Sequence, residues 1–198
     1  MTEFPAFAVA VVGLLAVPGP TNTLLATAGA ATGVRAALRL LPGEIGGYLV
    51  AIGFFTQAVA PLIAGLPAVP VVIKILAGAY LVWLAARLWR DPGSATTVQA
   101  NNPIRLRDVF LTTLLNPKAL IFAFAIFPSG RTFELLPYAL MFSVLVVGCG
   151  GAWVLLGDTL RRSSGGFATR RRVARASAIV LAVFAVTLAG SAVAPFVT

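Results

Sequence analysis

The sequence predicts an all-α integral membrane protein with six transmembrane helices, arranged as two inverted three-helix repeats in which helices 1 and 4 are discontinuous. The first observation behind this prediction is composition: 59% of the 198 residues are hydrophobic and 11% are charged, whereas about a quarter of the residues of soluble proteins are charged. The second is that apolar stretches close to the ~20 residues needed to cross a bilayer alternate with short polar blocks. The third is the placement of the basic residues.

Six apolar stretches are separated by these polar blocks, and no soluble domain fits between them. The predicted spans are Phe4 to Thr32, Leu40 to Ala60, Val69 to Leu88, Val109 to Phe127, Leu136 to Leu156 and Ala176 to Val197. We expect one transmembrane domain over residues 1–198, made of a first repeat (1–95), a cytoplasmic linker (96–107) and a second repeat (108–198). The first stretch lacks the basic region and cleavage site of a signal peptide, so we expect it to be a retained helix.

Twelve of the fifteen basic residues lie in the connections between spans 1 and 2, 3 and 4, and 5 and 6. They are Arg35, Arg39, Arg87, Arg90, Arg105, Arg107, Arg161, Arg162, Arg170, Arg171, Arg172 and Arg175. The other two connections and both ends carry only Arg131, so the positive-inside rule places both termini on the non-cytoplasmic side. This distribution explains the net charge of +9 by topology, and nucleic acid is not expected as a partner.

Few side chains are suited to catalysis. The chain has no histidine and a single cysteine, Cys149, which excludes an internal disulfide, a histidine-based metal site and a histidine general base. A membrane-embedded enzyme needs a nucleophile with a base, or a metal set. We therefore expect no enzyme activity, no catalytic residue, no metal and no cofactor, and without a glycine-rich phosphate loop ATP is not the direct energy source.

Two predicted spans contain a proline-directed break. The first span has 29 residues and would reach ~44 Å as a straight helix, against a hydrocarbon core of ~30 Å. Pro18-Gly19-Pro20 interrupts it, because Pro20 has no amide donor and clashes with the preceding turn. Asn116-Pro117-Lys118 lies about ten residues into the fourth span, near the midplane.

The two halves of the sequence match in register. Pro20 and Pro117 are each followed thirteen residues later by a glycine, Gly33 and Gly130, and a Gly-Gly pair opens a similar pattern in the second and fifth spans. Three spans per repeat are an odd number, so the second copy must be inverted in the membrane. The alternative is that two glycine-rich apolar helices resemble each other by composition alone.

Broken helices at matching places in inverted halves indicate a transport site, since unwound backbone at membrane depth lines a cavity or is buried in protein. Inversion brings the N-termini of the two second half-helices to the midplane, where their partial positive charge suits a carboxylate. The candidate substrate-binding residues are Pro18, Gly19, Pro20, Thr21, Asn22, Asn116, Pro117 and Lys118.

Two charged residues within the spans are singled out. An ammonium at the bilayer centre costs ~2.5–3.5 kcal/mol, so Lys118 is a candidate ligand for an anion; alternatively it stabilises the break by binding the carbonyls freed by Pro117, and both roles can coexist. Glu44 is a candidate proton carrier, because a carboxyl group removed from water favours its neutral form. Its alternative is an interfacial pair with Arg39.

Most other polar and small residues receive a structural interpretation. Asp108 and Asp158 are expected to be boundary charges beside arginines. Close helix packing is the expected role of the glycines at 43, 46, 47, 53, 148, 150, 151 and 157. Tyr48, Tyr80, Trp83 and Trp89 are expected to be packing residues or interface anchors, with Tyr48 also a candidate for lining a cavity.

At these residues the sequence resembles the LysE/RhtB family of amino-acid exporters, the LysE-type translocators. The resemblance rests on Pro18-Gly19-Pro20, on Gly33 with Arg35, and on Asn116-Pro117-Lys118-Ala119 with Phe122 and Pro128 in register. It implies a small secondary transporter of the bacterial inner (plasma) membrane that exports an amino acid or related zwitterionic metabolite, with proton coupling. The chain departs from the family in having Thr21 directly after Pro-Gly-Pro and Gly47 where many members have an acid, for which Glu44 is a candidate substitute.

The resemblance implies a small amino-acid-like molecule and membrane lipids as partners, and it leaves a homo-oligomer open. The alternative function is a non-transporting membrane accessory or assembly protein, or a small-solute channel, on the same scaffold. Two helix breaks and a buried lysine weigh against a scaffold, because they cost stability.

Overall fold

The computed structural model describes residues 3–63, 65–66, 68–90, 104–128, 130 and 132–162, with 175, 178–179, 182–183 and 185–186. Every regular element in this part of the chain is helical. In chain order they are α1 (Glu3–Leu15), α2 (Pro20–Thr32), α3 (Val34–Ala37), the short 3₁₀ helix η1 (Leu38–Leu40), α4 (Leu41–Phe54), the π-helical turn η2 (Phe55–Val59), α5 (Ala60–Ile63), α6 (Ala68–Arg90), α7 (Leu106–Leu114), α8 (Lys118–Ile121), the π-helical turn η4 (Phe122–Ile126) and α9 (Thr132–Arg162).

Four of the predicted spans have the length and hydropathy to cross a membrane. Val34–Leu62 and Thr132–Arg162 do so as single helices, and two bent helix pairs do so if each pair is one span. α6 covers the third predicted span with 23 residues. The sixth, Ala176 to Val197, lies almost entirely outside the described residues, as do Arg131, Arg170, Arg171, Arg172 and most of the 96–107 linker, so the six-span arrangement stays a prediction.

α9 is longer than the predicted span at both ends, and it contains Pro137. This proline lies near the start of the helix, where its missing N–H leaves only the carbonyl of Phe133 without an intrahelical donor. The helix continues through Pro137 as far as Arg162.

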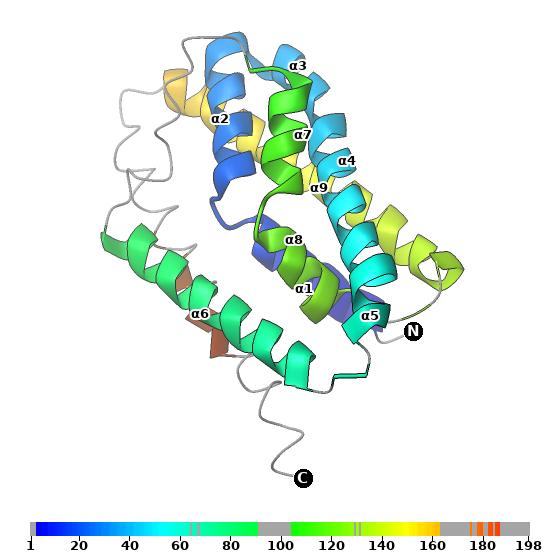
Figure 1. Ribbon diagram of the computed structural model, residues 1–198. Helices are drawn as coiled ribbons and strands as arrows, with labels where there is room; N and C mark the ends of the chain where they lie inside the picture. The colour runs from blue at the N-terminus through cyan, green and yellow to red at the C-terminus, as the bar shows by residue number, and fades with distance from the viewer. Residues whose placement is uncertain are drawn as a thin grey trace.

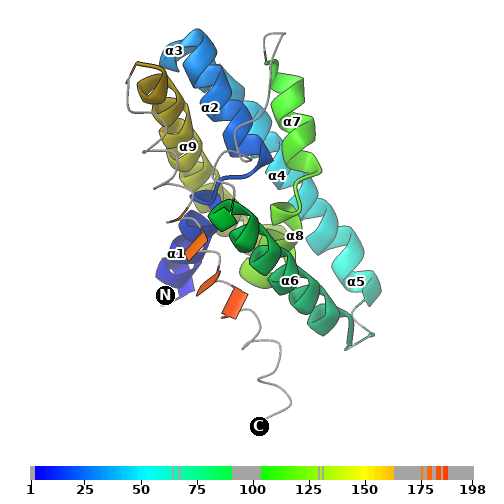
Figure 2. The same cartoon turned by 90° about the vertical axis from the view of Figure 1, so that its left-hand side faces the viewer.

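Both predicted breaks are present. The chain bends by 65° between α1 and α2 and by 55° between α7 and the α8–η4 segment. In Figure 1, α2 and α7 lie side by side above the bends, and α1 and α8 lie below them. The 90° view in Figure 2 shows the same division, with α1 and α8 beneath α2 and α7. α2 ends at Gly33, whose φ of 80° falls in the left-handed region that glycine tolerates.

Glycines bring two helix pairs into backbone contact above the bends. A Cβ atom added at Gly29 would overlap the backbone of Val154, and one added at Gly157 would overlap the backbone of Ala26, so α2 and α9 are packed directly against each other. α4 approaches α7 in the same way, since a Cβ at Gly47 would lie 2.7 Å from the Phe110 carbonyl oxygen. The packing role predicted for the glycines is confirmed at Gly47 and Gly157, whereas Gly53 and Gly148 have no neighbour within 4 Å of an added Cβ atom. Gly29 was not among the predicted packing glycines.

Below the bends, the core is built from aromatic rings. Phe122 and Phe142 meet edge to face with centroids 4.9 Å apart, and Tyr48 packs against both at 5.3 and 5.7 Å. Phe7 and Phe127 extend the cluster toward α1. Edge-to-face pairs of this kind stabilise a core beyond the area that they bury, and here they join α1, α4, η4 and α9.

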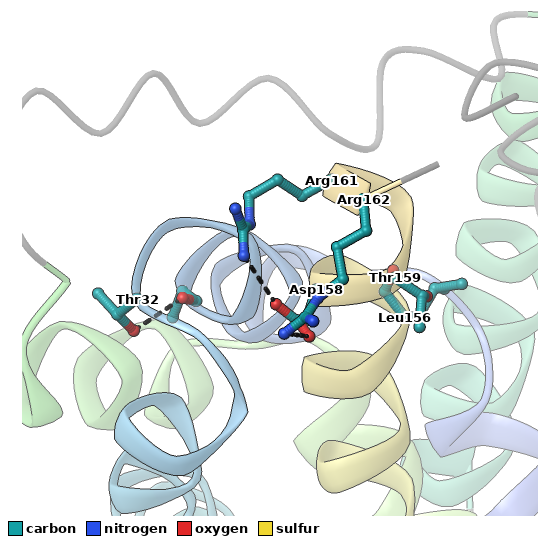
Figure 3. A network of polar contacts seen from close by, with 7 residues as sticks. Thr32, Leu156, Asp158, Thr159, Arg161 and Arg162 are labelled. Carbon is teal, nitrogen blue, oxygen red and sulfur yellow. Dashed lines mark hydrogen bonds and ion pairs between the residues drawn. The ribbon is translucent and has the colours of Figure 1, made fainter. Parts of the chain in front are cut away.

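Three segments that carry arginines lie at one end of the bundle. α3, the start of α7 and the end of α9 lie together at the top of Figure 1. There Asp158 binds Arg161 at 3.2 Å and Arg162 at 2.9 Å (Figure 3). Asp108 pairs with Arg107 at 3.5 Å. Both acids are boundary charges beside arginines, as the sequence predicts.

Candidate functional site at the meeting of the two helix breaks

The first break leaves carbonyl oxygens at the end of α1 that accept hydrogen bonds from side chains. The ammonium of Lys118 donates to the Val17 oxygen at 2.6 Å. The amide of Asn22 donates to the Val17 oxygen at 2.6 Å and to the Leu15 oxygen at 2.8 Å. A positive group is favourable here, because a helix C-terminus carries partial negative charge.

Two further features shape this end of α1. The indole N–H of Trp153, on α9, donates to the Leu15 oxygen at 3.3 Å. Gly19 lies against Lys118, since a Cβ there would be 3.1 Å from both the Cε and Nζ atoms of the lysine. Lys118 is only 1% exposed. Its backbone is part of the second break, but its ammonium is buried against the first.

The second break is satisfied mainly within itself. The Asn116 N–H donates to the Thr113 oxygen at 3.0 Å, and the Ala119 N–H donates to the Asn116 oxygen at 2.9 Å. The Asn116 side chain accepts the Lys118 backbone N–H at 3.1 Å, which places it as a local cap for α8. A short turn therefore replaces the missing helical bonds.

Polar side chains join one break to the other. The amide of Asn116 donates to the hydroxyl of Thr21 at 3.2 Å and to that of Tyr48 at 3.4 Å. Thr113 donates to the Val109 oxygen at 2.7 Å, so in its 3.1 Å contact with Thr21 it is the acceptor. The bonds thus run in one direction, from Asn116 through Thr21 to Thr113. All three side chains are buried.

Glu44 lies one turn before Tyr48 on α4 and is 1% exposed. Its Oε2 atom is buried and has no hydrogen-bond partner. Gly150 of α9 leaves room for it, because a Cβ there would lie 2.5 Å from Oε2. No ion pair joins Glu44 to Arg39, both of which the structure describes, so the interfacial pairing considered from the sequence is not seen.

The structure brings most of the predicted site residues together. Thr21, Asn22, Asn116 and Lys118 form one hydrogen-bonded group, with Pro18 and Gly19 buried beside it. Pro20 is exposed and Pro117 half-buried, so these two shape the breaks from outside the group.

One sequence interpretation needs correction at this site, and two residues are added to it. The ammonium of Lys118 donates to the carbonyl of Val17 in the other half of the chain, whereas the Thr113 carbonyl before Pro117 accepts the backbone N–H of Asn116. Thr113 and Trp153 were not expected here. The position of Thr113 one turn before Asn116 was the only signal in the sequence.

Within the described residues no three side chains of the His, Cys, Asp or Glu types come together in a way that could hold a metal ion. The groups that converge at the breaks are an ammonium, amides and hydroxyls. These donors are suited to a carboxylate, while the Leu15 and Val17 oxygens beside them are acceptors.

Comparison with known proteins identifies the family. A protein of Vibrio cholerae serotype O1, described as an uncharacterized membrane protein, is 43% identical over 60 residues, which cover 28% of this chain and 29% of that protein. The match thus spans less than a third of the relative's length. No solved structure matches. The LysE type translocator family matches residues 12–192, which is most of the chain. The chain therefore belongs to the LysE type translocator family.

Proposed function

We propose that the protein is a secondary active transporter that exports an amino acid or a related small zwitterionic metabolite across the bacterial inner membrane, coupled to the proton gradient. The observation that carries the proposal is the buried ammonium of Lys118 at the meeting of two broken helices. A buried charge inside a membrane protein marks a substrate or ion pathway by default.

The substrate carboxylate is assigned to Lys118 and to the N-termini of the half-helices. An ammonium has three donors, and the Val17 carbonyl takes one of them, which leaves two for a substrate. α2 starts at Pro20 with its first turn buried at Thr21 and Asn22, so its partial positive charge acts at the same place.

The coupling proton is assigned to Glu44. Its side chain is buried, and Oε2 accepts no hydrogen bond. A carboxyl group in this setting is stabilised by holding a proton. The carboxyl group fills the space that the missing side chain of Gly150 leaves, so release of the proton requires the surrounding helices to move.

Alternating access is assigned to rocking of the two halves, residues 1–95 and 108–198, as inverted repeats. Thr21 and Lys118 each directly follow the proline of a break, and each bonds to a residue just before the other break, Thr113 and Val17 respectively. This reciprocal pattern is what a two-fold axis in the membrane plane would produce. The presence of three segments that carry arginines at one end supports a cytoplasmic position for that end and non-cytoplasmic termini.

Transport by purified protein tests the proposal. Liposomes are loaded with a labelled amino acid, given an inward or outward pH gradient, and followed for loss of label. We expect gradient-dependent efflux of at least one amino acid, and we expect Glu44→Gln to lose the dependence on the gradient while still exchanging labelled for unlabelled substrate.

Two results would count against the proposal. If no amino acid moves under any gradient while the protein remains folded, the protein is not such an exporter. If conductance is seen without coupling to protons, the channel alternative replaces it.

A further inference from the structure

The end of α1 has the properties of a cation site. The Leu15 and Val17 oxygens face side-chain donors from three elements, α2, α8 and α9. These oxygens lie at a helix C-terminus, where the partial charge is negative. In transporters with broken helices, freed carbonyls and half-helix C-termini of this kind coordinate a sodium ion.

In this chain, the ammonium of Lys118 already occupies that place. Its Nζ atom lies 2.6 Å from the Val17 oxygen, in a side chain that is 1% exposed. Gly19 closes the site from the other side, at a distance that leaves no room for a further methyl group without a shift. A metal ion and this ammonium cannot both occupy the position.

We propose that the carbonyl end of α1 is a monovalent-cation site that Lys118 fills with its own ammonium, so that neither sodium nor potassium binds at this position. The inference goes beyond the proposed function, because it concerns the group that occupies the end of α1 and neither the substrate nor the coupling proton. One ammonium donor holds the α1 end, and the others remain free for the substrate.

The site would accept a free cation if the ammonium were removed. The Val17 oxygen, which now accepts a hydrogen bond from the ammonium at 2.6 Å, would then be a ligand. Rotation of the Asn22 amide by half a turn would add its Oδ1 atom, since the two ends of an amide have nearly the same shape.

A matched pair of variants tests the proposal in detergent, without substrate. Lys118→Ala opens the position, whereas Lys118→Met fills it with an apolar chain of similar length. Thermal unfolding is measured at constant ionic strength in choline chloride and with increasing sodium, potassium or methylammonium chloride. We expect the alanine variant to unfold at a lower temperature in choline and to recover saturably by roughly 5–10 °C as a small cation binds.

The wild-type protein and Lys118→Met should show no saturable response to any of these cations. The proposal is overturned if wild type is stabilised saturably by sodium, or if Lys118→Ala responds no more than Lys118→Met. An alanine variant that is unfolded even at high concentrations of every cation also contradicts it, because an open site should then be filled.

This outcome is separate from that of the proposed function. A protein that moves no amino acid can still show the cation-dependent recovery of Lys118→Ala. Conversely, an active exporter can lack it.

Discussion

Both helix breaks leave backbone groups without a partner in the helix, and these groups are hydrogen-bonded in different ways at the two breaks. At the second break, backbone N–H groups of Asn116 and Ala119 form a local turn, and the Asn116 side chain caps the next helix. At the first break, the Leu15 and Val17 oxygens depend on side chains, two of which, Lys118 and Trp153, come from the other half of the chain. The second break is therefore satisfied locally, whereas the first depends on how the two halves are docked.

Under the proposed function, this difference would link substrate binding to movement. A substrate that attracts the Lys118 ammonium also alters the end of α1, because the same group binds the Val17 oxygen. The first break can thus respond to an event at the second. Variants at the two breaks should consequently have unequal effects.

The largest effect is expected for Lys118→Met. This variant removes the charged donor from the first break and the proposed ligand of the substrate carboxylate. We therefore expect transport in liposomes to fall at least about 100-fold, which corresponds to a loss of ~2.8 kcal/mol of binding free energy for the substrate. The loss of a hydrogen bond from a charged group should also lower the free energy of unfolding by about 1.5–3 kcal/mol. Arg39→Met, at an exposed position, is the control. Transport within threefold of wild type would refute the assignment.

Asn22→Leu tests the dependence of the first break on side chains. It removes two neutral hydrogen bonds to the Leu15 and Val17 oxygens, each worth about 0.5–1.5 kcal/mol. We expect the free energy of unfolding to fall by about 1–3 kcal/mol in denaturant titrations. An unchanged stability would mean that the carbonyls of α1 find other donors, and the contrast between the breaks would be lost.

The features that could be predicted from the sequence are those with local causes. Pro18, Pro20 and Pro117 predict both breaks, because the effect of a proline on a helix does not depend on the rest of the fold. The predicted meeting of the breaks follows from three spans per repeat, and Thr21 and Asn116 are indeed joined.

The features that could not be predicted depend on packing between distant segments. The partner of Lys118 is Val17, 101 positions away, and nothing near Lys118 in the chain indicates it. The depth of Glu44 depends on Gly150, a residue of the other half that leaves space for the carboxyl group. From the sequence alone, Glu44 could therefore be interpreted either as a buried proton carrier or as the partner of Arg39 in an interfacial ion pair.

A double-mutant cycle on Thr21 and Thr113 measures the connection between the breaks. Each change to valine should cost about 1 kcal/mol of unfolding free energy, and the pair should be non-additive by about 0.5–1 kcal/mol because the two hydroxyls share a bond. The control cycle combines Thr21→Val with Thr32→Val, whose hydroxyl bonds only within α2 at 2.9 Å to the Ala28 oxygen. Equal coupling in both cycles would show that the 3.1 Å contact does not join the breaks energetically.

The smallest single effect is expected for Trp153→Phe. Its 3.3 Å bond to the Leu15 oxygen is long, and Asn22 also donates to that oxygen, so the change should cost only about 0.5–1 kcal/mol. The double variant with Asn22→Leu is different, because the Leu15 oxygen then loses both side-chain donors. Its cost should exceed the sum of the single changes by about 1 kcal/mol or more, which denaturant titration can resolve. Simple additivity would mean that water or the backbone reaches this carbonyl, and that the first break is no more dependent on its neighbours than the second.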